Sequence, residues 1–389
     1  MKRHHILAIG FLTVIFVFGI ISDVNLIRHY ASHEVINEEW TPELGRKNET
    51  EYAQVFSGKD ELVDLNGGMR NVLGQREMNG VVRLKNGQLT EMGREPVKKK
   101  KLRREAANVA ALSDYLKQQG IPFLYVMPPD KIMPMDDEEK AALFPEGFDD
   151  DINDEIDIFL DSLSAWDVSY IDLRQNLLKD KDSWYDRFYK TDHHWTSQAG
   201  FEAYQSIARW IKDNTDIPID ERAADIENYD LEDYKNCLLG SWGQRTGSLF
   251  SGADDITLFV PKYETDVENL TFNKRGTMDT AVYNREYIHE NSPDFIFDAV
   301  FDSTDQFVNY SSENDTTIMI ITDSYGRVVN PFLILSGRNM WYQSSYRSSE
   351  INEKQIQKLE PDIVIMLQSP RNNLGVDSSY QFDIPGVKN

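Results

Sequence analysis

Chemically reactive side chains gather at two places in the sequence. The first is the tripeptide Asp192-His193-His194, which sets a carboxylate beside two imidazoles. A carboxylate next to an imidazole forms half of the relay that activates a hydroxyl nucleophile. The second place supplies a hydroxyl, because Ser324 follows the apolar run 317–322, which is typical of a buried strand. A serine at the exit of a buried strand is where hydrolase folds expose a nucleophile.

Each place also has an ordinary structural interpretation. Asp-His neighbours arise by chance, and the Asp-Ser-Tyr-Gly sequence at 323–326 consists of residues that favour turns. A metal site on Asp192, His193 and His194 is a further alternative. Adjacent side chains in an extended chain point to opposite sides, however, and the sequence offers no other ligand cluster. We therefore predict no metal and no cofactor, with Asp192 and His194 on one face and His193 on the other.

The overall charge excludes one class of partner. The chain has 389 residues, of which 41 are basic and 65 acidic, giving a formal net charge of −24. Nucleic-acid binding needs a positive surface, so we do not expect nucleic acid as a partner. Cys237 is the only cysteine, which excludes an intrachain disulfide and a thiolate metal site. The basic run 98–104 is interpreted as a solvated helix face; the alternative is a landing site for an anionic polymer or lipid.

The amino terminus predicts a membrane anchor. Lys2 and Arg3 precede an apolar run at 6–21, and no small-x-small cleavage site follows it. An uncleaved signal anchor fits this pattern, with its basic end in the cytoplasm. We therefore predict a transmembrane helix at 1–24 and a polar spacer at 25–55. The remaining domain, 56–389, is expected on the extracytoplasmic side of the cell membrane.

Strand and helix patterns alternate through this domain. Asn86-Gly87 marks a two-residue hairpin turn, and apolar residues at helical spacing predict a helix that ends near Gly120. Buried strands are predicted at 122–127, 168–173, 317–322, around 340 and 363–367, and further helices at 152–163, 197–211 and from about 351. This alternation predicts an α/β domain with a parallel sheet and helices on both faces. Glycine-rich punctuation between about 225 and 310 predicts a strand-rich insertion.

The order of these motifs resembles the bacterial DHHW family, which is similar to the SGNH-hydrolase-like proteins of alginate O-acetylation. The acetylation proteins carry Asp-x-His-Trp where this chain has Asp192-His193-His194-Trp195. Supporting matches occur in the same order at Asn79-Gly80-Val81, Pro128-Pro129-Asp130-Lys131, Asp172-Leu173-Arg174, Asp323-Ser324-Tyr325 and Pro361-Asp362. The resemblance covers most of the chain beyond the predicted anchor.

The resemblance implies an SGNH-hydrolase-like, flavodoxin-like fold with permuted motif order, in which the aspartate and histidine precede the nucleophile. It implies that Ser324 is the nucleophile, His194 the general base and Asp192 the carboxylate that orients the base. These roles agree with the reading from residue types alone, since triads are recognised by geometry and not by chain order. The backbone N–H groups of Ser324 and Tyr325 are expected to stabilise the oxyanion.

Two further site features are expected. Arg371 follows the last predicted strand, where the acetylation proteins keep a site residue, although Ser369-Pro370 stands where a glutamate is expected. The aromatic residues Trp184, Tyr185 and Trp195 could stack on sugar rings and keep water from an acyl-enzyme. Packing beneath a loop is the alternative for these aromatic side chains.

The resemblance also implies an activity. This is transfer of an acetyl group to hydroxyls of an exported polysaccharide through an acetyl-serine intermediate, with a membrane-bound O-acyltransferase as the partner that supplies acetyl groups. Two alternatives stay open on the sequence. One is a carbohydrate O-acetyl esterase with the same triad, in which water and not sugar reaches the acyl-enzyme. The other is a non-catalytic polysaccharide-binding scaffold on the same fold.

Overall fold

The computed structural model describes residues 58–387, except 147, 149, 151 and 179–180. The predicted anchor at 1–24 and the predicted spacer at 25–55 lie outside these residues. Within the part of the chain that is described, no helix has the length and apolar character needed to cross a bilayer.

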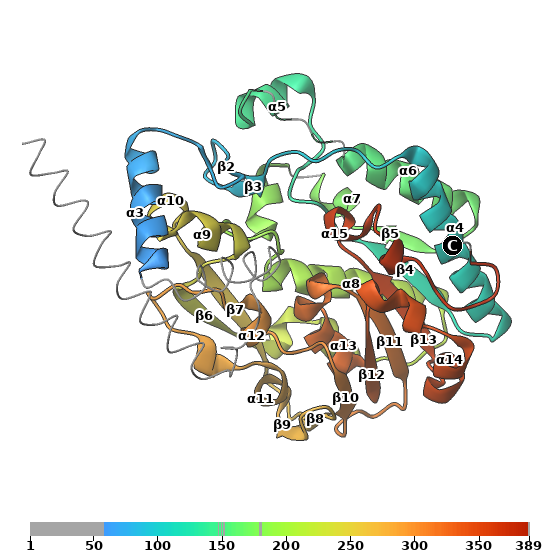
Figure 1. Ribbon diagram of the computed structural model, residues 1–389. Coiled ribbons are helices and arrows are strands. Elements are labelled where there is room, and N and C mark those ends of the chain that lie inside the picture. Colours follow the sequence, from blue (N-terminus) through green and yellow to red (C-terminus); the bar gives the residue numbers. More distant parts are fainter. Residues whose placement is uncertain (1–57, 147, 149, 151, 179–180, 388–389) are drawn as a thin grey trace, which may run out of the picture.

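An eight-stranded sheet forms the centre of the domain (Figure 1). Its spatial order is β5 (Tyr170–Asp172), β4 (Phe123–Met127), β13 (Ile363–Leu367), β11 (Thr317–Thr322), β12 (Asn339–Ser344), β10 (Gln306–Asn309), β8 (Val267–Asn269) and β9 (Lys274–Gly276). The first five strands are parallel, and the last three are antiparallel to their neighbours. Strands β4, β11 and β13 are buried along their whole length, which is why their sequences are continuously apolar. The predicted parallel sheet is thus present and is extended at one edge by antiparallel strands.

Helices cover both faces of the sheet. α4 (Lys99–Gln118), α6 (Ile152–Ala165) and α14 (Glu353–Leu359) lie on one face, and α8 (Ser197–Asn214) and α13 (Asn330–Ser336) lie on the other. The crossover from β4 through α6 to β5 leaves the sheet in the opposite direction from the crossover from β11 through α13 to β12. Because such crossovers are right-handed, their helices fall on opposite faces. This arrangement is a mixed α/β fold with a sheet flanked by helices.

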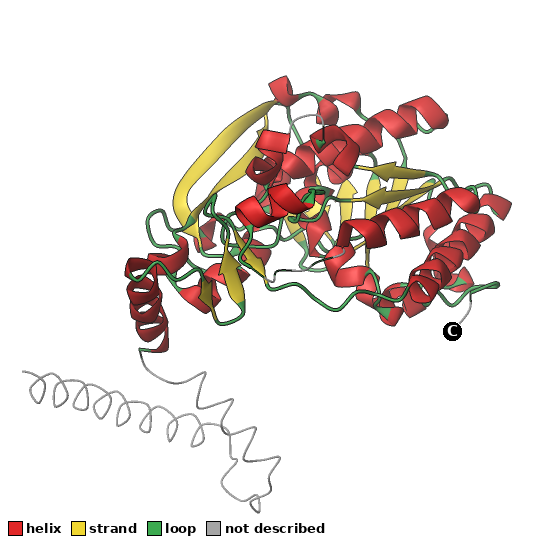
Figure 2. Cartoon of the chain, turned by 90° about the horizontal axis from the view of Figure 1, so that it is seen from above, coloured by secondary structure: helices red, strands yellow, loops and turns green. Residues whose placement is uncertain are grey.

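The segment 225–310 is strand-rich, as predicted, and part of it joins the main sheet as β8, β9 and β10. The rest forms two long antiparallel strands, β6 (Tyr229–Leu238) and β7 (Asp254–Pro261), which pack against α8. Figure 2 shows this pair as a curved ribbon at the end of the domain away from the C-terminus. The short helices α9 (Ser241–Thr246) and α10 (Ser248–Ser251) connect the two strands.

A small second layer lies beside these helices. α3 (Lys59–Val72) and a three-stranded sheet of β1 (Glu77–Met78), β2 (Val81–Arg83) and β3 (Leu89–Glu91) pack on α9 and α10. The predicted hairpin is confirmed, since β2 and β3 pair, but its loop has three residues and not the predicted two. The amide of Leu84 donates to the carbonyl of Gln88, and Gly87 alone within the loop has a positive φ, of 88°. The remaining short helices are α5 (Asp137–Leu143), α7 (Arg174–Leu177), α11 (Met278–Val282), α12 (Phe297–Val300) and α15 (Pro370–Asn373).

Candidate active site

Polar side chains converge where the parallel strands end. Asp130 follows β4, Ser324 follows β11 and Ser369 follows β13, so all three lie at the carboxyl edge of the sheet. The segment 191–195 crosses this edge and enters α8, which Thr196 caps through a hydrogen bond from the Ala199 amide. Open α/β sheets bind their ligands at this edge.

Asp192, His194 and Ser324 form one hydrogen-bonded chain. Nδ1 of His194 lies 2.7 Å from Oδ1 of Asp192, and Nε2 lies 2.7 Å from Oγ of Ser324. An ionised carboxylate only accepts hydrogen bonds, so Nδ1 carries the proton and Nε2 is left to accept the Ser324 hydroxyl. Asp192 and His194 are buried, whereas Ser324 is half-buried. The structure therefore brings together all three residues that were predicted to act as a triad.

Burial and the neighbouring charges set the ionisation of this chain. Burial raises the pKa of Asp192, but the two histidines outweigh it through charge and hydrogen bonds and hold that pKa well below its usual range. Burial lowers the pKa of His194, and the charge of His193 lowers it further, against the opposing effect of Asp192. A neutral imidazole is the form that can take a proton from a serine. The site thus favours an ionised Asp192 beside a neutral His194.

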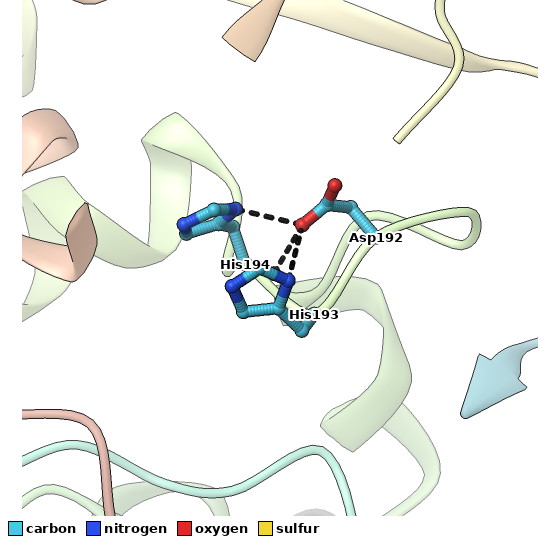
Figure 3. A group of neighbouring side chains, drawn as sticks. All are labelled: Asp192, His193 and His194. Carbon is cyan, nitrogen blue, oxygen red and sulfur yellow. Dashed lines mark hydrogen bonds and ion pairs between the residues drawn. The ribbon is translucent and has the colours of Figure 1, made fainter. Parts of the chain in front are cut away.

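His193 does not point away from Asp192. Its Nδ1 lies 3.0 Å from Oδ1 of Asp192, and its ring centroid lies 3.9 Å from that of His194 (Figure 3). The expectation that the two histidines face opposite sides is wrong because this segment bends and is not extended. Asp192 accepts the backbone N–H of His194 at 2.9 Å, as in an Asx turn. Both imidazoles consequently reach the same carboxylate.

The same bend brings candidate metal ligands together. One oxygen of Asp192 and one nitrogen each of His193 and His194 lie within 4.8 Å of one another. These atoms also make the hydrogen bonds of the relay, so a bound cation would replace the proton between His194 and Asp192. The direct contact of His194 with Ser324 favours proton transfer as the use of this cluster.

Lys131 holds the loop that carries Asp192. Its fully buried ammonium donates to the carbonyls of Tyr189, Lys190 and Asp192 at 2.6, 3.1 and 2.9 Å. The indole of Trp242 lies over the same ammonium at 4.7 Å. Burial lowers the pKa of Lys131 to about 7, and the surrounding carboxylates oppose this effect. Three carbonyl acceptors call for three N–H donors, and only the charged amine supplies them.

Residues after β6 complete the support of the carboxylate. The Ser241 amide donates to Oδ2 of Asp192 at 2.5 Å, and the Gly240 amide donates to Oγ1 of Thr191 at 2.8 Å. Asp254 accepts the amide and hydroxyl of Thr191 at 2.7 and 2.6 Å. The sequence reading gave none of these residues a place in the site. The signal that could have found them is the glycine-rich run at 240–243, which interrupts the strand pattern.

Asp323 fixes the turn that carries Ser324. Its carboxylate accepts the amide of Tyr325 at 3.0 Å, the amide of Ser369 at 3.1 Å and the side-chain amide of Asn373 at 2.6 Å. The hydroxyl of Ser369 also donates to it. The amide of Tyr325 is therefore committed to Asp323, and of the two amides expected to bind an oxyanion only that of Ser324 remains a candidate.

The aromatic residues tie the loop to the nucleophile turn. The Trp195 indole donates to the carbonyl of Tyr325 at 2.9 Å, and the Tyr325 hydroxyl donates to the carbonyl of His193 at 2.7 Å. Trp184, Tyr185 and Trp195 are all buried. Of the two alternatives for these aromatic residues, their burial supports packing inside the domain and not stacking on sugar rings.

Arg371 lies in an ion pair. Its Nε and one terminal nitrogen bond both oxygens of Asp130 at 2.9 and 2.7 Å, and its other terminal nitrogen bonds Asp150 at 2.9 Å. Among the residues described, no hydrogen bond joins it to Ser324. Its geometry thus supports a role in fixing the loop after β4 and not the direct place in the site that was expected for it.

Phe297 covers the imidazole of the base. Its ring lies over His194 with centroids 4.0 Å apart and planes inclined by 16°. This contact keeps water from one face of His194 and contributes to the burial that lowers its pKa. Arg327 ties α12 to the nucleophile segment through an ion pair of 2.9 Å with Asp298. The sequence around Phe297 is irregular and carries no pattern that would assign it to the site.

Comparisons with known proteins agree with this geometry. Residues 89–271 match a family described as the SGNH hydrolase-like domain, acetyltransferase AlgX. A structure of Bacillus cereus PatB1 with a sulfonyl adduct is similar at a TM-score of 0.62 and 18% identity, covering 79% of this chain and 99% of that chain. A DHHW family protein from Eubacterium siraeum is similar at a TM-score of 0.56 and 14% identity, covering 78% and 95%. None of the curated proteins matches the sequence.

These comparisons confirm the predicted resemblance to SGNH-hydrolase-like acetylation proteins and to the DHHW family. The structural matches show that the fold is shared with these proteins, and the family match describes it as SGNH-hydrolase-like and supports an enzyme of the acetyltransferase type. The matched segment includes Asp192 and His194, whereas Ser324 lies beyond it.

Proposed function

From the match to an SGNH-hydrolase-like acetyltransferase domain, we propose that this protein transfers acetyl groups to hydroxyls of an exported polysaccharide. One observation carries the proposal: an unbroken hydrogen-bonded chain runs from Asp192 through His194 to Ser324. This arrangement activates a serine for acyl transfer. The family description indicates that the acyl group is acetyl.

In the first step, Oγ of Ser324 attacks the carbonyl carbon of an acetyl donor while Nε2 of His194 takes the hydroxyl proton. Asp192 keeps the imidazole oriented and stabilises its positive charge. The oxyanion that forms is within the reach of the Ser324 amide. The donor's leaving group departs with the proton from His194, and acetyl-Ser324 remains.

In the second step, a sugar hydroxyl attacks acetyl-Ser324 and gives its proton to His194. The carbon–Oγ bond breaks, Ser324 regains a proton from His194, and the polysaccharide carries a new acetyl ester. Water would follow the same route and turn the enzyme into an esterase.

We place the domain outside the cell membrane, anchored by residues 1–24, with a membrane-bound O-acyltransferase as the source of acetyl groups. The basic flank and uncleaved apolar run of the amino terminus support this placement. A domain on that side has no access to cytoplasmic acyl donors, so its acetyl group must be passed across the membrane.

Covalent labelling tests the nucleophile. PatB1 is known with a sulfonyl adduct, so a sulfonyl fluoride is a suitable probe for this chain. Peptide mass spectrometry should locate the sulfonyl group on Ser324 in the wild type and find none at that peptide in Ser324→Ala. Labelling that avoids Ser324 would leave the non-catalytic polysaccharide-binding scaffold as the better interpretation.

The acceptor test separates transferase from esterase. Release of nitrophenol from p-nitrophenyl acetate is followed with and without an added cell-surface polysaccharide, and acetyl groups on the polymer are then counted. A transferase releases nitrophenol faster with the acceptor and leaves acetyl esters on the polymer. Release of free acetate alone, at a rate that the polymer does not change, would identify an esterase.

A further inference from the structure

Resting on the proposed function, we propose that His193 is a positioning residue that keeps His194 neutral and able to accept a proton from Ser324. It does so by taking up the first proton offered to the pair. This role is distinct from that of the general base, because His194 is the residue that accepts the hydrogen bond of the Ser324 hydroxyl.

Both imidazoles bind the same oxygen. Nδ1 of His194 and Nδ1 of His193 lie 2.7 and 3.0 Å from Oδ1 of Asp192. Since this oxygen accepts and does not donate, Nδ1 of His194 carries a proton. Nδ1 of His193 also lies 3.1 Å from Oγ of Ser241, a hydroxyl that can accept or donate a hydrogen bond. The second oxygen of Asp192 is occupied by the amide of Ser241. A further proton on His194 must therefore go to its Nε2, whereas a charged His193 offers its Nδ1 proton to Asp192 and Ser241.

The two rings differ in their access to water. The side chain of His193 is 27% exposed and that of His194 only 4%. Nε2 of His194 already accepts the hydroxyl of Ser324. A charged His193 keeps its ion-pair contact with Asp192, whereas a second proton on His194 breaks the contact that activates the nucleophile.

Charges around the two histidines favour protonation of His193 before His194. Burial lowers the pKa of His193, but Asp192 outweighs it and Asp323 adds to the effect, so that the pKa is raised despite the opposing charge of Lys131. For His194, burial and the charge of His193 lower the pKa against Asp192 and Asp298. The pKa of His193 is raised and that of His194 is lowered, and such opposite pKa shifts in neighbouring groups indicate that they have different roles.

Two positive rings with centroids 3.9 Å apart repel each other. Once His193 is charged, a proton on His194 costs more, and the pair titrates as one coupled system. As the pH falls, His193 is protonated first, and its charge delays the protonation that inactivates His194. The base therefore stays active to a lower pH than a lone imidazole would.

The test is the pH profile of kcat/KM for p-nitrophenyl acetate in His193→Gln. Glutamine keeps an N–H donor for Asp192 but carries no charge. Removing the positive neighbour raises the pKa of His194, so the acid limb should move up by about one pH unit. The rate at the wild-type midpoint should then fall about fivefold, with the high-pH plateau changed by less than about threefold. The exposed His289 supplies the control, since His289→Gln should leave the profile unchanged.

Three outcomes separate the possibilities. An acid limb that stays in place or moves to lower pH overturns the inference, whatever happens to the plateau. If His193→Gln does not fold, nitrogen NMR of the wild-type imidazoles decides, because His194 protonating before His193 overturns the inference as well. Failure of the proposed function is recognised separately, because Ser324→Ala would then keep its rate on the ester.

Discussion

Gly240 lies directly against the carboxylate of Asp192. A β-carbon at Gly240 would lie 2.3 Å from Cβ of Asp192 and 2.4 Å from its Oδ2, well inside van der Waals contact. This approach lets the next residue, Ser241, present its amide to Oδ2 at 2.5 Å. The orientation of the carboxylate that holds His194 therefore depends on the absence of a side chain at position 240.

Gly240→Ala should displace Asp192 and lower kcat/KM on an acetyl ester by about 100-fold, since small misplacements of a catalytic group cost about that much. The backbone itself permits alanine, because Gly240 has a φ of −68°. Gly87→Ala is the matched control: its φ of 88° strains the backbone, but nothing lies within 4 Å of the new methyl group. That variant should lose stability and keep its rate. Full activity in Gly240→Ala would show that the carboxylate does not need this contact.

The relay could be predicted from the sequence because its parts are local signals. Asp192 and His194 stand in one short motif, and Ser324 follows a strand whose apolar run is unmistakable. The central strands and α4, α6 and α8 also follow their periodicities. The part of the site that the sequence does not reveal is formed by contacts between segments that are distant in the chain. Ser241 reaches Asp192 across 49 positions, and no periodic pattern in 225–310 signals that approach.

The position of His193 could not be predicted for a different reason. Alternation of side chains holds only in extended chain, and one hydrogen bond from the amide of His194 to the carboxylate of Asp192 bends this segment. The sequence also could not determine whether Trp195 is buried. The same local sequence is compatible with an indole that packs beneath a loop and with one that stacks on a sugar. Both outcomes depend on the tertiary neighbours of the loop.

Lys131→Met should loosen the loop that carries Asp192. The variant keeps the length of the side chain but leaves three buried carbonyls without their donor, which should cost about 3 kcal/mol of unfolding free energy. The rate should fall as well, since Asp192 is one of the three residues so held. Urea unfolding and ester hydrolysis measure the two effects. Lys212→Met, which removes an exposed lysine paired with Glu221, should change neither.

Removal of metal ions tests whether Asp192, His193 and His194 bind a metal. If the cluster transfers protons, dialysis against a chelator should leave kcat/KM on an acetyl ester unchanged, and added Zn²⁺ should inhibit by competing for Nδ1 of His193 and His194. Metal content and activity are measured on the same samples. Activity that disappears with the chelator and returns with one divalent ion would favour a metal site on Asp192 and the two histidines.

The amino end of α4 is unfavourably charged. Lys98 stands at the N-cap without a capping side chain, and no acidic residue lies in the first turn. Lys98→Asp supplies an acceptor for free backbone N–H groups and a negative charge at the positive end of the helix dipole. It should therefore stabilise the protein by about 1 kcal/mol. Lys117→Asp, in the last turn of the same helix, should destabilise the protein. Thermal melts of both variants provide the comparison, and equal shifts would rule out the dipole explanation.

Glu105 makes the stability of the domain depend on pH. It is buried on α4, where Oε2 accepts the amide of Gly375 at 3.0 Å and Oε1 has no partner among the residues described. Burial raises its pKa to about 7, against the lowering effects of the Gly375 amide and of the nearby Lys101 and Arg104. A raised carboxyl pKa means that the folded state holds its proton more tightly than the unfolded state. The stabilisation of the folded state by the bound proton of Glu105 is fully present below the unfolded pKa near 4.5, and it is lost as the pH rises through about 7.

Above pH 7 the protein must therefore bury a charged Glu105. Glu105→Gln keeps an oxygen for the Gly375 amide and removes the charge, so it should raise the unfolding free energy at pH 8 by about 2 kcal/mol. At pH 4 the two proteins should be nearly equal, because Glu105 is then neutral in the folded wild type. Urea unfolding at both pH values measures the difference, and Glu353→Gln, an exposed change on α14, provides the control. A gain of equal size at pH 4 and pH 8 would show that packing, and not the buried charge, accounts for the effect.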